Sequence, residues 1–121
     1  MFLGKTQQTQ TPRPAQSARS SMNRSMSALA YETQRMTEEL GKARIRNEDG
    51  KLTKLTKADM QALILNAETR PAQVRKYIDA LEIDSTSRGH IRKCITNINK
   101  LAKKIRPLQK KLAVVAMNGP R

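Results

Sequence analysis

The clearest hydrophobic pattern of the chain lies near its C-terminus, where apolar side chains recur at alternating steps of three and four residues. The series consists of Ile91, Cys94, Ile98, Leu101, Ile105, Leu108, Leu112 and Val115. This spacing is typical of one face of an α-helix and predicts a helix from about 86 to 117. Pro107 either bends this helix or separates two helices, because proline removes one backbone hydrogen bond. Asp84, Ser85 and Ser87 are its competing N-cap candidates.

A second series with the same spacing predicts a long first helix over 20–46. Its apolar or small members are Met22, Met26, Leu29, Thr33, Met36, Leu40 and Ala43. We expect this helix to stop at the turn-forming residues 47–50, where Gly50 supplies a left-handed backbone conformation.

Two shorter helices are predicted between these long ones. Thr56 is placed to cap the amide of Asp59, with Leu55 stapled onto Met60, and the buried stripe of this helix is Met60, Leu63, Ile64 and Ala67. Pro71 suits the first turn of the next helix, which ends near Ile83. Its inner face consists of Val74, Tyr77, Ile78 and Leu81.

Residues 1–19 are polar and include Pro12 and Pro14, so they cannot bury enough apolar surface to fold alone. We expect an extended basic arm over 1–19 and a helical domain over 20–121. The fold class is therefore all-α, with a long first helix and a small bundle of about four helices. The stretch from Thr11 to Tyr31 contains Arg and Ser but no acidic residue, a composition also typical of a mitochondrial transit peptide.

Charge is distributed unevenly along the chain. The formal net charge is +14, and residues 1–31 and 85–121 contain no acidic side chain, whereas residues 32–84 hold ten basic and ten acidic ones. Segregated positive charge on a small protein indicates phosphate binding, because a polyanion releases counterions when Lys and Arg neutralise it. Aromatic residues make up only 2 % of the chain. Since readers of single strands stack bases on aromatic rings, duplex binding is favoured.

The candidate nucleic-acid-binding residues fall into two groups. The first is the cationic face of the last helix: Arg92, Lys93, Lys100, Lys103, Lys104, Arg106, Lys110 and Lys111. The second lies on the arm and first helix: Arg13, Arg19, Arg24, Arg35, Lys42, Arg44 and Arg46. These residue types address phosphates, so we expect little sequence specificity. A helix-turn-helix formed by the two short helices is less favoured, because Asp79, Glu82 and Asp84 would repel nearby phosphates.

The sequence offers no support for catalysis or for a cofactor. The single histidine, His90, has no neighbouring nucleophile or paired carboxylate, and the five glycines are isolated. Cys94 and His90 lack a second ligand pair, so no metal site is predicted, and Cys94 fits a small core residue. The longest apolar run is too short to span a bilayer. A basic amphipathic helix also suits anionic membranes or acidic protein grooves, but the stripe lacks Trp and Phe anchors.

The order of a polar basic arm, "TQQTQTPRPAQSARSS", a long helix, and a final helix, "HIRKCITNINKLAKKIRPLQKKLAVVAM", resembles the helical major coat proteins of filamentous and rod-shaped archaeal double-stranded DNA viruses. The resemblance implies a virion nucleocapsid in which paired coat subunits, as homo- or heterodimers, wrap the genome as an A-like duplex. The alternative is a structural protein bound to structured RNA in a ribosome or mitochondrial ribosome. Copy number per particle distinguishes the two.

Overall fold

The computed structural model describes residues 14–118, which form four helices and one two-stranded hairpin. The predicted helical class is confirmed. In chain order the elements are α1 (Pro14–Leu40), β1 (Arg44–Arg46), β2 (Leu52–Lys54), α2 (Lys57–Thr69), α3 (Pro71–Asp79) and α4 (Ser85–Asn118).

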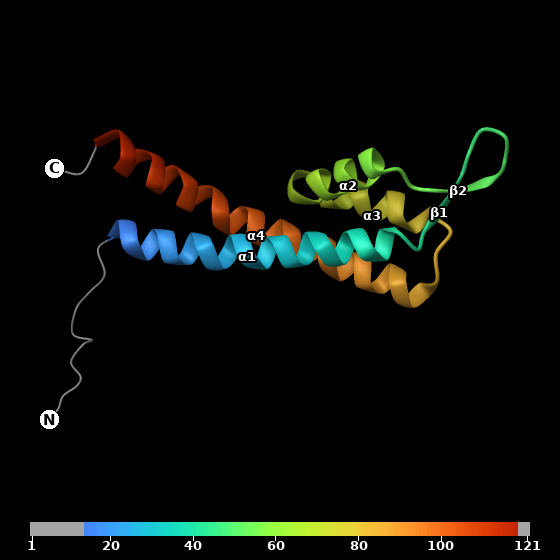
Figure 1. Ribbon diagram of the computed structural model, residues 1–121, viewed down its shortest axis with the longest axis horizontal. Coiled ribbons are helices and arrows are strands. Elements are labelled where there is room, and N and C mark those ends of the chain that lie inside the picture. The colour runs from blue at the N-terminus through green and yellow to red at the C-terminus, as the bar shows by residue number, and fades with distance from the viewer. Residues whose placement is uncertain (1–13, 119–121) are drawn as a thin grey trace, which may run out of the picture.

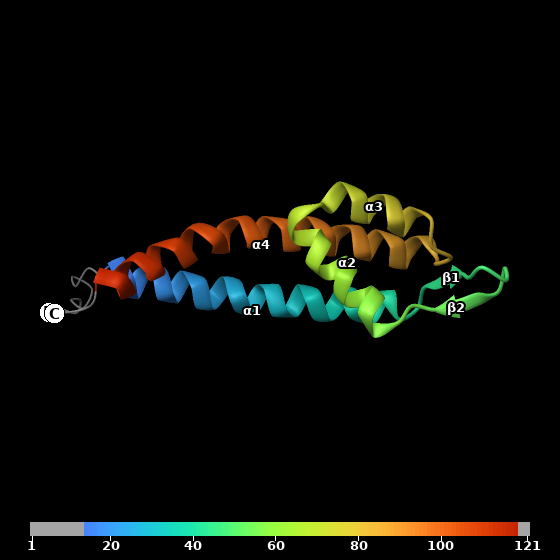
Figure 2. The same ribbon diagram turned by 90° about the horizontal axis from the view of Figure 1, so that it is seen from above.

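The two long helices, α1 and α4, run antiparallel beside each other and form the axis of an elongated molecule (Figure 1). The short helices α2 and α3 pack against this pair only near the end from which the β-hairpin projects (Figure 2). Toward the other end, α1 and α4 continue as a two-helix pair that no other described element covers.

The hydrophobic core lies where all four helices meet. Met36, Leu40, Ile78, Ile91, Ile95 and Ile98 are fully buried there. The predicted inner faces of the short helices are confirmed: Leu63, Ala67, Val74, Ile78 and Leu81 are buried, and Met60, Ile64 and Tyr77 pack partly buried against the core. Cys94 is also a core residue, with 1 % of its surface exposed.

The predicted limits of the first helix were wrong at both ends. The helix α1 begins at Pro14, six residues before the predicted start, and ends at Leu40, six before the predicted end. Pro14 fits the first turn of a helix, where its missing N–H has no intrahelical partner. Ala18, 3 % exposed, belongs to the buried surface rather than to an arm. Of the predicted arm, residues 1–13 lie outside the described residues.

The segment that was expected to complete the first helix forms a β-hairpin instead. Strands β1 and β2 pair antiparallel, with Arg44 opposite Lys54 and Arg46 opposite Leu52. The predicted turn connects them: Gly50 has a φ of 80°, and the Lys51 amide donates to Asn47 Oδ1 at 2.9 Å. At the hairpin base, Arg44 and Glu82 exchange two backbone hydrogen bonds of 2.9 Å, which ties the hairpin to the segment before α4.

Both short helices begin where the sequence predicts. The Asp59 amide donates to Thr56 Oγ1 at 3.0 Å and the Thr56 amide donates to Asp59 Oδ2 at 3.2 Å, which completes a capping box. Pro71 occupies the first turn of α3. This helix stops at Asp79, four residues before the predicted end, because Leu81 turns into the core and Glu82 pairs with the hairpin.

Helix α4 is a single helix from Ser85 to Asn118 and continues through Pro107. It follows a shallow arch along α1 (Figure 2). Asp84 is the residue that caps its N-terminus, since the Ser87 amide and hydroxyl donate to the two carboxylate oxygens at 2.8 and 3.0 Å.

These observations divide the described residues into two regions. We call residues 32–98 the head, which contains the four-helix core and the hairpin, and residues 14–31 together with 99–118 the stalk. The head carries thirteen basic and ten acidic residues, whereas the stalk carries eight basic residues and no acidic one. The charge segregation of the sequence is therefore also a segregation in space.

Candidate nucleic-acid interface

A straight row of lysines follows the exposed side of α4. Lys93, Lys100, Lys104 and Lys111 are separated by seven, four and seven residues, so they share one side of the helix, and all four are exposed. At 1.5 Å per residue the row is about 27 Å long. Lys103 and Lys110, also exposed and seven residues apart, run beside it. We call these six side chains the lysine row.

The lysine row lies opposite the buried stripe of the same helix. Ile91, Ile98 and Ile105 are buried against α1 and the short helices, with at most 5 % of their surface exposed. The predicted separation of an apolar face from a cationic face is confirmed. The apolar stripe keeps α4 in place and leaves the lysines exposed. Near the C-terminal end of α4, the half-buried Leu108 and Val115 lie three and four residues from Lys111, so Lys111 flanks the contact with α1.

The arginines of α4 behave differently from its lysines, because each is bonded within the protein. Arg92 forms an ion pair with Asp79 of α3, and Arg106 donates to the backbone carbonyl of Glu68 at 3.2 Å. Arg88 donates to the Leu81 carbonyl at 3.0 Å. Within residues 14–118, the lysine row has no ion pair or hydrogen bond to a protein acceptor. The arginines fasten α4 to the head, and the lysines remain open to solvent.

The predicted residues of the first helix do not form one continuous surface. Arg19 and Arg24 are exposed on the stalk, next to the C-terminal half of α4. Arg35 lies in the head, half-buried, with its guanidinium 6.0 Å from the Tyr31 ring centre. Lys42 pairs with Glu39 at 3.4 Å. Arg13 lies outside the described residues.

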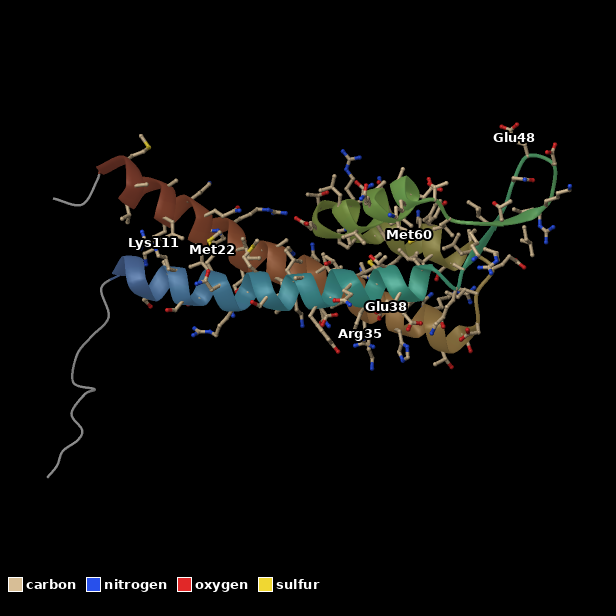
Figure 3. The ribbon with its side chains drawn as sticks, viewed as in Figure 1. Met22, Arg35, Glu38, Glu48, Met60 and Lys111 are labelled. Carbon is tan, nitrogen blue, oxygen red and sulfur yellow. The ribbon has the colours of Figure 1, made fainter. Side chains whose placement is uncertain are left out.

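The hairpin separates two further predicted residues from the lysine row. Arg46 donates to the Gly50 carbonyl at 2.6 Å, and Arg44 donates to the Ala43 carbonyl at 3.0 Å. Figure 3 shows the distance involved: Lys111 is at one end of the molecule, and Glu48 of the hairpin turn is at the other. Arg19 and Arg24 therefore share the stalk with most of the lysine row, but at five residues apart they point to different sides of α1, and Arg35, Lys42, Arg44 and Arg46 lie elsewhere. An "Asp-Gly" turn with β-branched Ile45 and Thr53 on either side was the sequence signal for this hairpin.

Cys94 is packed in the core, and His90 lies near a carboxylate of α1. Burial raises the pKa of Cys94 to about 11, and the nearby Glu32 carboxylate adds to this effect, so the thiolate is scarce at neutral pH. His90 Nδ1 lies 3.8 Å from Glu39 Oε2 at a half-exposed position. Among residues 14–118 no three His, Cys, Asp or Glu side chains gather as metal ligands would.

None of the described helices combines the length and the hydrophobicity that crossing a membrane requires. Comparison of the chain with protein-family models, curated proteins and solved structures gave no match.

Proposed function

We propose that this protein is a structural nucleic-acid-binding protein that coats or packages double-stranded DNA through phosphate contacts, as a major coat protein of a virion. The observation that supports this most directly is the lysine row. It combines a line of exposed ammonium groups, five of them in the stalk, where the described residues hold no carboxylate side chain, with a helical support.

The geometry of the row suits a phosphate backbone. Its lysines are spaced along the helix by about 6 or 10 Å, and its total length of about 27 Å is close to one turn of duplex, roughly 34 Å. An exposed ammonium group on a flexible stem adapts to phosphates at such spacings without reading bases. The arginines Arg19 and Arg24 add two further exposed cations to the stalk.

The salt dependence of DNA binding gives this proposal a quantitative test. If each of the six lysines meets one phosphate, the logarithm of the affinity falls with the logarithm of salt concentration with a slope of about −5. The described residues contain two aromatic side chains, Tyr31 and Tyr77, and Tyr77 packs against the core. Tyr31 is then the one exposed aromatic ring of the described residues, which leaves little capacity for base stacking, so random duplexes of equal length bind alike.

A pair of matched triple variants tests the proposal. Lys100, Lys104 and Lys111 are changed to Gln in one, and Lys51, Lys54 and Lys57 of the head, which are equally exposed, are changed to Gln in the other. Both lose the same net charge. We expect the stalk variant to bind a random duplex more weakly and to reduce the salt slope by about 3, while the head variant changes the slope by less than about 1.

Equal losses in the two variants would show that binding follows net charge rather than the lysine row. Strong preference for one sequence would point to base readout, which the row cannot provide. A duplex RNA measured in parallel tests the ribosomal alternative: tighter binding to RNA, with no regular filaments on DNA in electron micrographs, would support that alternative instead.

A further inference from the structure

The outer side of helix α2 is exposed and carries no charge. Leu65 has 64 % of its surface exposed, the largest fraction among the large apolar side chains of the head. The other exposed side chains of this side are Ala58, Gln61, Ala62 and Thr69. At about 100° per residue they lie opposite Leu63 and Ala67, which are buried in the core. Helix α2 is therefore already packed on its inner side, and its leucine on the outer side has no neighbour among the described elements.

The shape of this outer side suits a second helix. In Figure 1, α2 is the outermost helix of the head, above the α1–α4 pair. A hollow of about 290 Å³ lies on its α1 side, between Thr37 and Ile64, and one of about 190 Å³ lies on its α3 side, between Asn66 and Gln73. Leu65 thus stands on a ridge between two hollows, and helices pack by fitting ridges into such grooves.

Four charged residues border the outer side in a self-complementary order. Lys57 and Glu68 lie on the α1 side, at the beginning and the end of α2. Asp59 and Arg70 lie on the α3 side with the opposite order of charge. Each pair is eleven residues apart, about three turns, so its members share one side of the helix. Within residues 14–118, none of these four side chains forms an ion pair.

We infer that this outer side is a docking surface for the same side of α2 in a second copy of this chain, with the two helices antiparallel. We call Ala58, Gln61, Ala62, Leu65 and Thr69 the α2 face. A two-fold axis brings each border of the face against the same border of the second copy, with its ends exchanged. Lys57 then meets Glu68 of the second copy, and Asp59 meets Arg70 of the second copy.

Size and charge both favour the antiparallel direction. Leu65 and Ala58 lie at equal distances from the middle of the α2 face, which falls between Gln61 and Ala62. An antiparallel pair therefore sets each leucine over the small Ala58 of the other copy, whereas a parallel pair opposes leucine to leucine and leaves a gap between the alanines. Antiparallel helix dipoles also attract each other. The head carries thirteen basic and ten acidic residues, so two heads approach with little net repulsion.

Disulfide cross-linking of the full-length, nucleic-acid-free protein tests the pairing and its direction. Ala62 lies beside the two-fold axis, so Ala62→Cys should form a covalent dimer under mild oxidation. Ala58→Cys should not, because the two introduced cysteines lie about 10 Å apart along the helices, beyond the reach of a disulfide. Ala72→Cys, at an exposed alanine of α3, is the matched control and should stay monomeric. The native Cys94 is buried and does not interfere.

A charge exchange in the Ala62→Cys protein tests the occupant. Lys57→Glu places carboxylates opposite each other and should lower the yield of covalent dimer, and adding Glu68→Lys should restore that yield. Both changes suit the helix dipole, so the fold is kept, which circular dichroism verifies. Lys54→Glu, at an exposed lysine of β2, makes the same change of net charge outside the α2 face and should leave the yield unchanged.

A monomeric Ala62→Cys protein would overturn the inference, and equal dimer yields at positions 58, 62 and 72 would do so by showing random collision. Cross-linking at 58 and 62 but not at 72 would mean a parallel pair and would overturn the antiparallel one. A charge exchange that fails to restore the dimer would show that α2 does not face a second α2. The inference does not rest on the proposed function, because no nucleic acid is present. A protein that cross-links as expected but fails to bind a duplex would contradict the proposed function alone.

Discussion

The head and the stalk contain the same apolar spacing but use it differently. Within α4, the head residues Ile91, Cys94, Ile95 and Ile98 are buried in the core, whereas Leu108, Leu112 and Val115 of the stalk are only half-buried. The stalk contributes only Ala18, Ala102 and Ile105 to the buried apolar residues. A regular spacing thus defines which side of a helix is apolar, and the number of neighbours decides how much of that side is buried.

The distribution of charged residues follows the same division between head and stalk. In the head, basic and acidic side chains form internal contacts such as Arg92–Asp79 and Lys42–Glu39. The stalk has cations without acidic partners, so their counter-charge comes from solvent or from a polyanion. We interpret the head as the part that maintains the fold, and the proposed function assigns phosphate binding to the lysine row, most of which lies on the stalk.

The largest expected effect on the free energy of unfolding comes from shortening one apolar side chain of α4 in each region. Ile98→Ala removes a fully buried side chain of the head and should lower the free energy of unfolding by about 2–5 kcal/mol. Leu112→Ala removes a half-buried stalk side chain and should cost less than about 1.5 kcal/mol. Urea denaturation measures both. Equal losses would mean that the stalk is packed as tightly as the head and would remove the basis of the comparison.

A second effect is expected within the single helix α4. Amide hydrogen exchange should be slowest at 91–98 and should become faster toward 108–117, by about two orders of magnitude, or about 3 kcal/mol in opening free energy. The reason is that helix ends with few buried contacts open locally without unfolding the core. Uniform protection along α4 in the monomer would contradict the division into two regions.

The sequence predicted those features that depend on neighbours in the chain. The capping box at Thr56, proline at the start of α3 and the lysine row opposite the stripe of α4 all follow from local spacing, and the structure has them. The hairpin was missed because Met36, Leu40 and Ala43 continue a helical series into it, while Gly41 and the pairing of Arg44 with Glu82 stop the helix. That pairing joins residues far apart in sequence, which no local pattern contains.

The sequence also predicted the residues of the candidate site only in part. Arg35, Lys42 and Arg46 were grouped with the lysine row because all are cations on predicted helices. Lys42 and Arg46 are separated from the row by the end of α1 at Leu40 and by their partners Glu39 and the Gly50 carbonyl, whereas Arg35 lies within the head part of α1 beside Tyr31. The exposure of Met26 could not be predicted either, since it depends on where α2 ends relative to α1.

A smaller effect is expected at the cap of α2, the helix whose last turn reaches the base of the stalk through the Glu68 carbonyl. Thr56→Ala removes the side-chain acceptor of the capping box and should cost about 1 kcal/mol. Thr69→Ala, an exposed position at the other end of α2, makes the same chemical change and should cost less than about 0.5 kcal/mol. Thermal or urea denaturation distinguishes them. Identical stabilities would indicate that the capping box adds nothing to the head.

The smallest expected effect concerns acid, which acts on the head alone because every carboxylate side chain of the described residues lies there. Hydrogen bonds from the backbone amide and hydroxyl of Ser87 hold the pKa of Asp84 below its ordinary value of 3.8. At Glu39, burial acts to raise the pKa, but hydrogen bonds from Ser87 and Lys42 and the charges of Lys42 and His90 outweigh it, and the pKa is lowered. Folding therefore favours the ionised forms. Their contribution to stability is complete above the ordinary pKa and is lost as pH falls through the lowered one.

The variant Asp84→Asn separates the cap from its titration. Asparagine is also a good N-cap, so stability at neutral pH should change little, while the loss of melting temperature between about pH 5 and pH 2 should become shallower than in the unchanged protein. Lys104→Gln in the stalk serves as the control and should leave the acid profile as it is. Melting curves followed by circular dichroism at several pH values measure both. If Asp84→Asn has the acid profile of the unchanged protein, the N-cap of α4 does not contribute to the acid sensitivity of the head; if Lys104→Gln alters that profile, the two regions are electrostatically coupled rather than separate.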